Sequence, residues 1–191
     1  MKGFLAGFCI ALGATVYLSV GGPLGALLFS IGLICVVTFG FDLFTGKAGL
    51  LATNEISVCR LGVIWFQNLF GVAVCALMLL LTPAYARLEA SAAAITQTRM
   101  AQTFLENMIY GVFCGIFMYV AVTGYKKTGN YLFAMMPVMV FIVCGFNHCV
   151  ADMFYVIMGG SDLKSLWSLI PTTIGNIIGT NFIPYLLRSG K

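Results

Sequence analysis

Apolar residues dominate this chain in long runs that contain no Asp, Glu, Lys or Arg. Six runs of this kind follow one another: Phe4–Val20, Pro23–Phe41, Leu61–Ala86, Asn107–Tyr125, Thr128–Ala151 and Ser165–Leu187. A helix needs about 20 mostly apolar residues to cross the hydrocarbon core of a bilayer. The pattern therefore predicts an all-α membrane protein with six transmembrane helices, which form a single transmembrane channel domain over residues 1–191.

Two of the six runs are interrupted by a similar short motif. Gly-Phe-Asp at 40–42 interrupts the second run, and Gly-Phe-Asn at 145–147 interrupts the fifth. Each time an Asn-x-x-Gly motif follows in the next run, beginning at Asn68 and at Asn176. Gly-interrupted spans at corresponding positions of two halves are typical of transport sites. We therefore expect the second and fifth helices to be broken.

The motifs divide the chain into two similar halves, with repeat one at about 1–82, a linker at about 83–103 and repeat two at about 104–188. Phe4-Leu5 and Phe104-Leu105 begin the first span of each half. Each half contains an odd number of spans, so the second half must enter the membrane from the opposite side. The sequence thus predicts two inverted three-helix repeats, an architecture common among transporters.

Composition excludes a soluble domain of this size. Charged residues make up 8% of the chain, against about 25% in soluble domains, and the mean hydropathy is +1.02. With six spans both termini face the same side, and that side carries most of the basic residues: Lys2, Arg60, Lys126, Lys127, Arg188 and Lys191. The other side carries Arg87, Arg99 and Lys164. This asymmetry predicts an inner (plasma) membrane protein with both termini in the cytoplasm, and not a nucleic-acid-binding protein.

The segment Asp42–Lys47 is the first candidate for functional chemistry. Unwound backbone inside a membrane is tolerated only where it meets protein or lines a water-filled cavity. A polar segment directly after an apolar run therefore indicates a broken helix at a pathway. An ordinary helix end at the membrane surface is the alternative.

The second candidate is His148, the only histidine of the chain, which lies within an apolar run. An imidazole titrates near neutral pH and can donate a hydrogen bond or a proton to a passing anion. The alternative is a buried histidine that is satisfied by hydrogen bonds. Neither a second histidine nor a CxxC pair accompanies it, so we expect no metal and no cofactor.

Asn68 and Asn176 are the third candidate, because each amide lies in the middle of an apolar run with a glycine three residues later. Such amides commonly form hydrogen bonds between transmembrane helices. We expect the two side chains to support the two breaks.

Several motifs, taken together and in this order, resemble the formate/nitrite transporter family: Phe29–Leu33, Asp42–Gly46, Gly145–His148, Ala151–Phe154 and Ile174–Gly179. The resemblance implies an aquaporin-like fold and a homopentamer with one pore per subunit. It also implies passage of small monovalent anions such as formate, nitrite or hydrosulfide. By position, Thr45 is similar to the family's pore threonine, with Leu43 and Phe44 beside it. His148 matches the central histidine, while Phe29 and Phe141 match aromatic constrictions.

The chain departs from the family pattern next to the histidine. The family usually has Glu before the histidine and Asn four residues after it, whereas this chain has Asn147 and Asp152. The family often has a lysine shortly before the proline of the fifth span, and here Asn130 stands at that position. Lys47, Lys126 or Lys127 could supply the positive charge instead. These departures concern the substrate more than the fold.

The leading functional hypothesis is a channel or proton-coupled carrier for a small monovalent anion or its acid, which is not an enzyme. Its expected partners are that anion, a proton, the lipid bilayer and further copies of the chain. The alternative is an intramembrane enzyme or redox protein that uses His148 together with Cys144 and Cys149.

Overall fold

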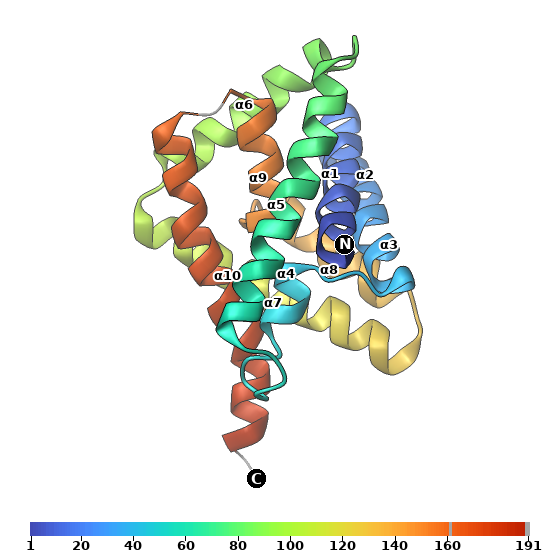
Figure 1. Cartoon of the computed structure of the whole chain (residues 1–191), viewed down its shortest axis with the longest axis vertical. Helices are drawn as coiled ribbons and strands as arrows, with labels where there is room; N and C mark the ends of the chain where they lie inside the picture. The colour runs from blue at the N-terminus through green and yellow to red at the C-terminus, as the bar shows by residue number, and fades with distance from the viewer. Residues whose placement is uncertain (161, 190–191) are drawn as a thin grey trace.

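The computed structural model describes residues 1–160 and 162–189 (Figure 1). These residues form ten helices: α1 (Lys2–Val20), α2 (Gly22–Phe29), α3 (Ile31–Phe39), α4 (Phe44–Ala48), α5 (Val58–Leu80), α6 (Tyr85–Ala101), α7 (Phe104–Thr128), α8 (Leu132–Val143), α9 (Cys149–Met158) and α10 (Leu163–Ser189). Lys191, one of the basic residues predicted for the cytoplasmic side, lies outside the described residues.

Four helical segments are long and apolar enough to cross a membrane: Lys2–Val20, Gly22–Phe39, Val58–Leu80 and Phe104–Thr128. The second of them consists of α2 and α3, which are separated only by a turn at Ser30. Of the two shorter apolar helices, α8 lies within the fifth predicted run, whereas α9 begins at the end of that run and continues beyond it to Met158. The prediction of an all-helical membrane protein is therefore confirmed in this broader form.

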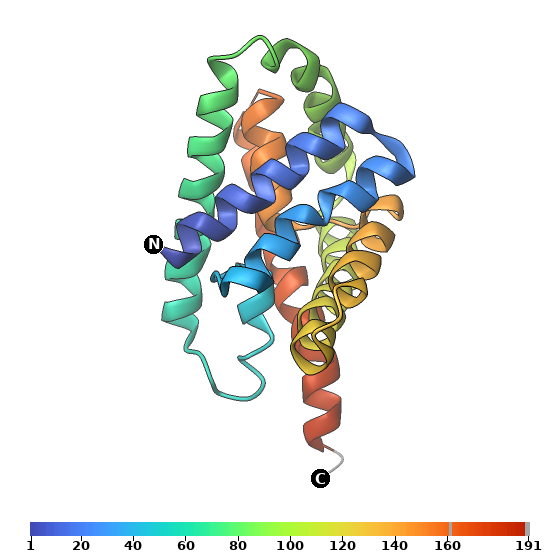
Figure 2. The ribbon, with the colours of Figure 1, turned by 90° about the vertical axis from the view of Figure 1, so that its right-hand side faces the viewer.

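The closest packing in the first half joins α1 to α5 (Figure 2). Gly7 of α1 lies against the backbone carbonyl of Asn68, and Gly71 of α5 lies against the carbonyl of Phe4. A Cβ atom at either glycine would collide with the facing carbonyl. Small residues at helix contacts allow backbones to approach in this way, which is typical of membrane proteins.

The second half repeats this arrangement between α7 and α10. Gly115 of α7 lies against the carbonyl of Asn176, and Gly179 of α10 lies against the carbonyl of Val112. The two tightly packed pairs hold the shorter helices α4, α8 and α9 in defined positions, because α4 contacts both α5 and α7 and α9 contacts both α5 and α10.

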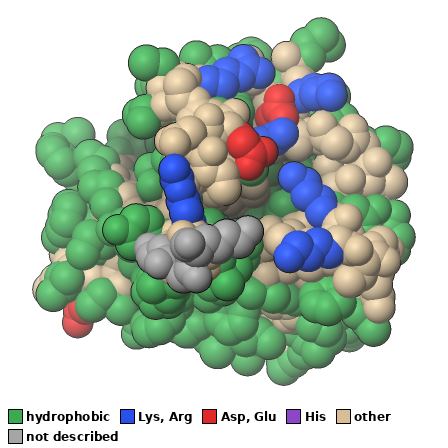
Figure 3. All heavy atoms as spheres, turned by 90° about the horizontal axis from the view of Figure 1, so that it is seen from below, with side chains coloured by type: hydrophobic (Ala, Val, Ile, Leu, Met, Phe, Trp, Pro, Cys, Tyr) green, Lys and Arg blue, Asp and Glu red, His purple; other side chains and the backbone are tan. Residues whose placement is uncertain are grey.

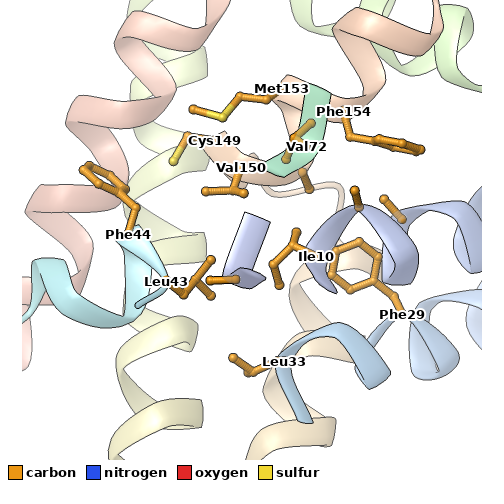
Figure 4. Packing of buried hydrophobic residues seen from close by; sticks show 14 of the residues in the cluster. Ile10, Phe29, Leu33, Leu43, Phe44, Val72, Cys149, Val150, Met153 and Phe154 are labelled. Carbon is orange, nitrogen blue, oxygen red and sulfur yellow. The ribbon is translucent and has the colours of Figure 1, made fainter. Parts of the chain in front are cut away.

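Helix α9 is the centre of the core, and nearly all of its side chains are buried. Val150 of α9 lies in a cluster that includes Ile10, Leu43 and Phe29 from the first half of the chain (Figure 4). Large apolar side chains also cover the outside, such as Phe66 of α5, which is 67% exposed. An outer surface of this kind suits lipid or a neighbouring subunit better than water.

Lys and Arg side chains gather at the end of the molecule that Figure 3 shows, with acidic side chains among them. This is the end at which α10 terminates (Figure 1). The basic side chains visible in this view thus cluster at one end of the helix bundle.

Candidate functional site

The first break separates α3 from α4. Gly40 ends α3 in the left-handed conformation, with φ 65° and ψ 39°, which a glycine adopts without steric cost. The chain is then non-helical up to Leu43, which is the N-cap residue of α4. The backbone is therefore non-helical between α3 and α4.

Asn68 of α5 holds this break through its side-chain amide. Its Oδ1 accepts a hydrogen bond from the backbone N–H of Phe44 at 2.8 Å. Its Nδ2 donates to the carbonyl of Asp42 at 2.9 Å and to the carbonyl of Gly3 at 2.8 Å. One buried amide thus pairs an N–H and a carbonyl that the interruption of the helix would otherwise leave unpaired, and it also ties them to α1.

The second break separates α8 from α9 and has the same construction. Gly145 has φ 73°, and the backbone stays non-helical up to His148, the N-cap residue of α9. Asn176 of α10 accepts from the backbone N–H of Cys149 at 2.9 Å. Its Nδ2 donates to the carbonyls of Asn147 and Gly111, at 2.9 Å each. We call the two arrangements the Asn68 clamp and the Asn176 clamp.

His148 and Thr45 meet where the two breaks come together. Thr45 Oγ1 lies 2.9 Å from His148 Nε2, and both side chains are buried. The Nδ1 atom of His148 accepts a hydrogen bond from the backbone N–H of Ala151 at 3.2 Å. A backbone N–H can only donate, so Nδ1 carries no proton. The ring proton is therefore on Nε2, which donates it to the threonine hydroxyl.

Two phenylalanines surround this contact. The Phe141 ring is stacked on the imidazole of His148, with centroids 5.7 Å apart and an interplanar angle of 11°. Phe29 meets Phe141 edge to face at 6.5 Å. Both rings are almost fully buried. Leu43 belongs to the same apolar cluster (Figure 4).

Two cavities border residues of this cluster. The first has a volume of about 190 Å³, and its lining includes Phe29, Phe141, His148, Arg99 and Asp152. We call it the histidine vestibule. The second has a volume of about 90 Å³, and its lining includes Leu43, Lys47 and Lys126. We call it the lysine vestibule.

Two of the predicted pore residues lie outside the linings of both vestibules. Phe44 lines a separate hollow of about 210 Å³, together with Trp65 and Ile177. The side chain of Thr45 reaches the site through its hydrogen bond to His148. The other predicted pore residues, Phe29, Leu43, Phe141 and His148, line one vestibule or the other.

Asp42 and Lys47, predicted as supporting residues, form an ion pair at the first break. Their charged atoms are 2.9 Å apart, and Arg60 lies 3.7 Å from the other carboxylate oxygen of Asp42. The Asp42 side chain is 14% exposed. The pair therefore sits at the edge of the lysine vestibule, where water screens part of its charge.

Asp152 has an ionic partner that the sequence reasoning missed. Arg99 of α6 places its Nε atom 3.4 Å from Asp152 Oδ1 and donates from Nη1 to the carbonyl of Gly145 at 3.0 Å. The Asp152 side chain is only 2% exposed. A buried carboxylate is expected to have a basic partner. This rule could have called for a base near Asp152, but it could not have said which one.

Asn147 contributes to the backbone and side-chain hydrogen bonds behind the second break. Its Nδ2 donates to Gln102 Oε1 at 3.0 Å and to Asn107 Oδ1 at 2.8 Å. Asn107 in turn donates to the carbonyl of Arg99 at 2.9 Å. The position before His148 therefore holds the end of α6 in place.

The cysteines of the alternative hypothesis differ in their surroundings. Cys144 is exposed and Cys149 is buried, while both ring nitrogens of His148 are hydrogen-bonded to other residues. Within residues 1–160 and 162–189, no group of three or more His, Cys, Asp or Glu side chains is placed to hold a metal ion.

Comparison with known proteins gives consistent matches along nearly the whole chain. The family described as "Formate/nitrite transporter" matches residues 1–189. The formate channel FocA of Haemophilus influenzae is 28% identical, over 94% of this chain and 81% of its own length. The uncharacterized transporter YrhG of Bacillus subtilis is 32% identical, over 93% of this chain and 78% of its own.

Solved structures agree with these matches. A pentameric formate channel with formate bound is similar with a TM-score of 0.82 and 26% identity, covering 100% of this chain and 96% of that one. An FNT family ion channel is similar in fold with a TM-score of 0.84 and 20% identity, covering 99% of this chain and 88% of that one.

Proposed function

The chain belongs to the formate/nitrite transporter family, and we propose that it is a membrane channel or proton-coupled carrier for small monovalent anions or their acids. The observation that carries this proposal is the contact between Thr45 and His148, which joins the two non-helical segments. His148 lines the histidine vestibule, and Leu43, close to Thr45 in sequence, lines the lysine vestibule. A formate-bound channel of similar structure supports formate as a substrate.

The apolar cluster beside the vestibules favours passage as a neutral molecule. Moving a bare anion past Phe29, Phe141 and Leu43 would carry a large desolvation cost, and protonation of the anion removes most of it. The His148 Nε2–H and the Thr45 hydroxyl can supply hydrogen bonds at the narrowest point. The substrate would thus exchange hydrogen bonds with the pore instead of crossing as an ion.

Six spans in two inverted repeats account for the matched geometry of the two halves. Gly3 and Asn68 bond across 65 residues of sequence, and so do Gly111 and Asn176. Phe4 and Val112 make the same carbonyl contact with a glycine. We therefore propose an alignment of the repeats that pairs Phe4 with Val112 instead of with Phe104. We propose that α2–α3 with α4, and α8 with α9, are the broken second and fifth spans.

A homopentamer with one pore per subunit is supported by the pentameric state named for a similar formate channel. Native mass spectrometry of the purified protein tests this assembly directly, and a monomer in mild detergent would contradict it.

We further propose an inner (plasma) membrane location with both termini cytoplasmic, which the basic end of the molecule supports (Figure 3). A C-terminal reporter active only outside the cytoplasm should give no signal.

Flux into proteoliposomes tests the proposed function itself. The purified protein is reconstituted and offered formate, nitrite, hydrosulfide, acetate and lactate under an inward proton gradient. We expect rapid uptake of the small anions and slower uptake of lactate. A folded pentamer that moves none of them would overturn the proposal. The names of the relatives, which are channels and transporters, favour transport over an intramembrane redox enzyme.

A further inference from the structure

Arg99 and Asp152 form an ion pair in which both partners keep unused bonding capacity. The Nε–Oδ1 distance of 3.4 Å is longer than the 2.7–2.9 Å typical of a strong charge-assisted bond. Asp152 Oδ2 is buried and has no hydrogen-bond partner among the residues that the structure describes. The guanidinium has five N–H donors, and the structure gives it one backbone acceptor besides Asp152.

Both groups line the histidine vestibule, together with His148. Arg99 also lines a second hollow, of about 160 Å³, where Lys164 of α10 lies. A small anion that reaches the vestibule thus meets a guanidinium with free donors. It also meets a carboxylate whose unpartnered oxygen is nine-tenths or more buried.

From this geometry we propose that Arg99 binds the incoming anion in exchange for Asp152, and that Asp152 carries the proton that accompanies the anion through the pore. This inference rests on the proposed transport function. A planar carboxylate such as formate matches the fork of a guanidinium. The anion and the Asp152 carboxylate compete for the same cation, so binding of one releases the other.

The released carboxylate takes up a proton, because a buried negative charge without a partner is strongly disfavoured. The proton comes from a hydronium ion that reaches the vestibule from the acidic side. One of its O–H bonds breaks as an O–H bond forms on Asp152, and a water molecule is left. In the next step the O–H bond on Asp152 breaks and a new one forms on the bound anion, which leaves Arg99 as a neutral acid. Asp152 is again a carboxylate and returns to Arg99. No electrons are exchanged, and one proton moves with each anion.

His148 is less suited to this exchange. Its Nδ1 would have to release the backbone N–H of Ala151 before it could accept a second proton. The other ionisable groups around Asp152 are Arg99 from α6, Tyr17 from α1, Cys114 from α7, and Cys149, Tyr155 and His148 around α9. Asp152 differs from these groups in two ways. Its charge partner, Arg99, can be taken over by an anion, and its Oδ2 atom has no hydrogen-bond partner among the described residues.

The test compares proton and formate fluxes in proteoliposomes that contain the full-length protein. Uptake of labelled formate and the change of internal pH are measured together, first with the membrane potential clamped at zero and then with imposed potentials of either sign. The wild type should move one proton with each formate. In Asp152→Asn we expect uptake driven by the pH gradient to fall about tenfold and the remaining flux to follow the membrane potential, a change equivalent to about 1.4 kcal/mol.

Arg99→Gln should raise the KM for formate about tenfold, because the binding cation is lost. Arg99→Gln combined with Asp152→Asn removes both charges, which preserves folding better than leaving one charge buried, and it should lack both saturation and proton coupling. Glu89→Gln and Arg87→Gln are matched controls on exposed positions of α6 and should behave as the wild type.

A proton-to-formate ratio of one in Asp152→Asn, or in the double variant if the single variant does not fold, would overturn this inference while the transport function stands. A wild type that moves no anion would overturn both. If the proton-to-formate ratio falls below one in His148→Asn but stays at one in Asp152→Asn, the residue that carries the proton is His148 and not Asp152.

Discussion

The two breaks of this protein share a backbone design and differ in their charged side chains. At both, a glycine with positive φ follows one helix, and a buried asparagine binds the first N–H of the next helix. Near the first break the acid, Asp42, is 14% exposed and has two basic partners. Near the second, Asp152 is 2% exposed and has one distant contact.

This difference separates what the scaffold requires from what transport requires. A broken helix within a membrane must have its backbone groups satisfied wherever it occurs, so both breaks need a clamp. A buried charge is costly, and charges inside a membrane protein usually mark a substrate or proton pathway. The asymmetry therefore locates the charge chemistry at the second break.

The clamps should give the largest effects. Asn68→Ala and Asn176→Ala each leave one backbone N–H and one carbonyl of a buried non-helical segment without the partner that the amide supplies. We expect each variant to lose about 3 kcal/mol or more, measured as a lower unfolding temperature of the detergent-solubilised protein. Gln97→Ala, an exposed amide on α6, is the control. Clearly unequal losses would show that the two clamps are not equivalent.

Substitution of the two glycines with positive φ at the breaks should cause the second-largest loss of stability. Gly40→Ala and Gly145→Ala place a Cβ on residues with φ 65° and 73°, and left-handed backbone costs a non-glycine residue about 1–2 kcal/mol. Both should lower the unfolding temperature by similar amounts. Gly62→Ala is the matched control, because it lies in α5 with open space around an added Cβ. It should be neutral or stabilising, and a loss as large as that of Gly40→Ala would contradict the argument from φ.

Substitutions of Thr45 and His148, which connect the two breaks through their hydrogen bond, should lower formate uptake with little loss of stability. Thr45→Val removes the hydroxyl that faces Nε2 of His148, and we expect formate uptake to fall about tenfold, equivalent to about 1.4 kcal/mol. His148→Asn keeps an acceptor for the N-terminus of α9 and should also lower uptake while preserving the proton-to-formate ratio. Unchanged uptake in both variants would exclude a role for this contact.

Asp42→Asn should have the smallest effect. Its ion pairs lie at the cavity edge, and partly exposed pairs contribute about 0–1 kcal/mol. We expect proton-coupled formate uptake within about twofold of the wild type. An effect as large as that of Asp152→Asn would erase the proposed difference between the two breaks.

The sequence was most informative where the chemistry is local. Apolar runs predicted the helical membrane fold, and the glycine motifs predicted non-helical backbone at both positions, because each signal depends on a few adjacent residues. Asn68 and Asn176 were also predicted to support the breaks, and their hydrogen bonds fit that role. Amides inside apolar runs have few other ways of being satisfied.

The sequence failed where distant segments fold against one another. Arg99 lies in a segment predicted as a linker, 53 residues from Asp152, so no local pattern could show that α6 packs against α9. The orientation of Phe44 was unpredictable for a related reason. Adjacent residues on a short helix point in different directions, so Leu43 and Phe44 line different cavities.

The Asn68 and Asn176 clamps also impose an order in time on the synthesis of the chain. Each binds a carbonyl 65 residues earlier in the sequence. At a synthesis rate of about 5–20 residues per second, the partner of each clamp waits roughly 3–13 s. During that interval the first arm and the broken span of each half have been synthesised, but the hydrogen bonds of the clamp cannot yet form. The packing of each half is therefore completed only after its own asparagine has been synthesised. In the first half, this can happen before the second half leaves the ribosome.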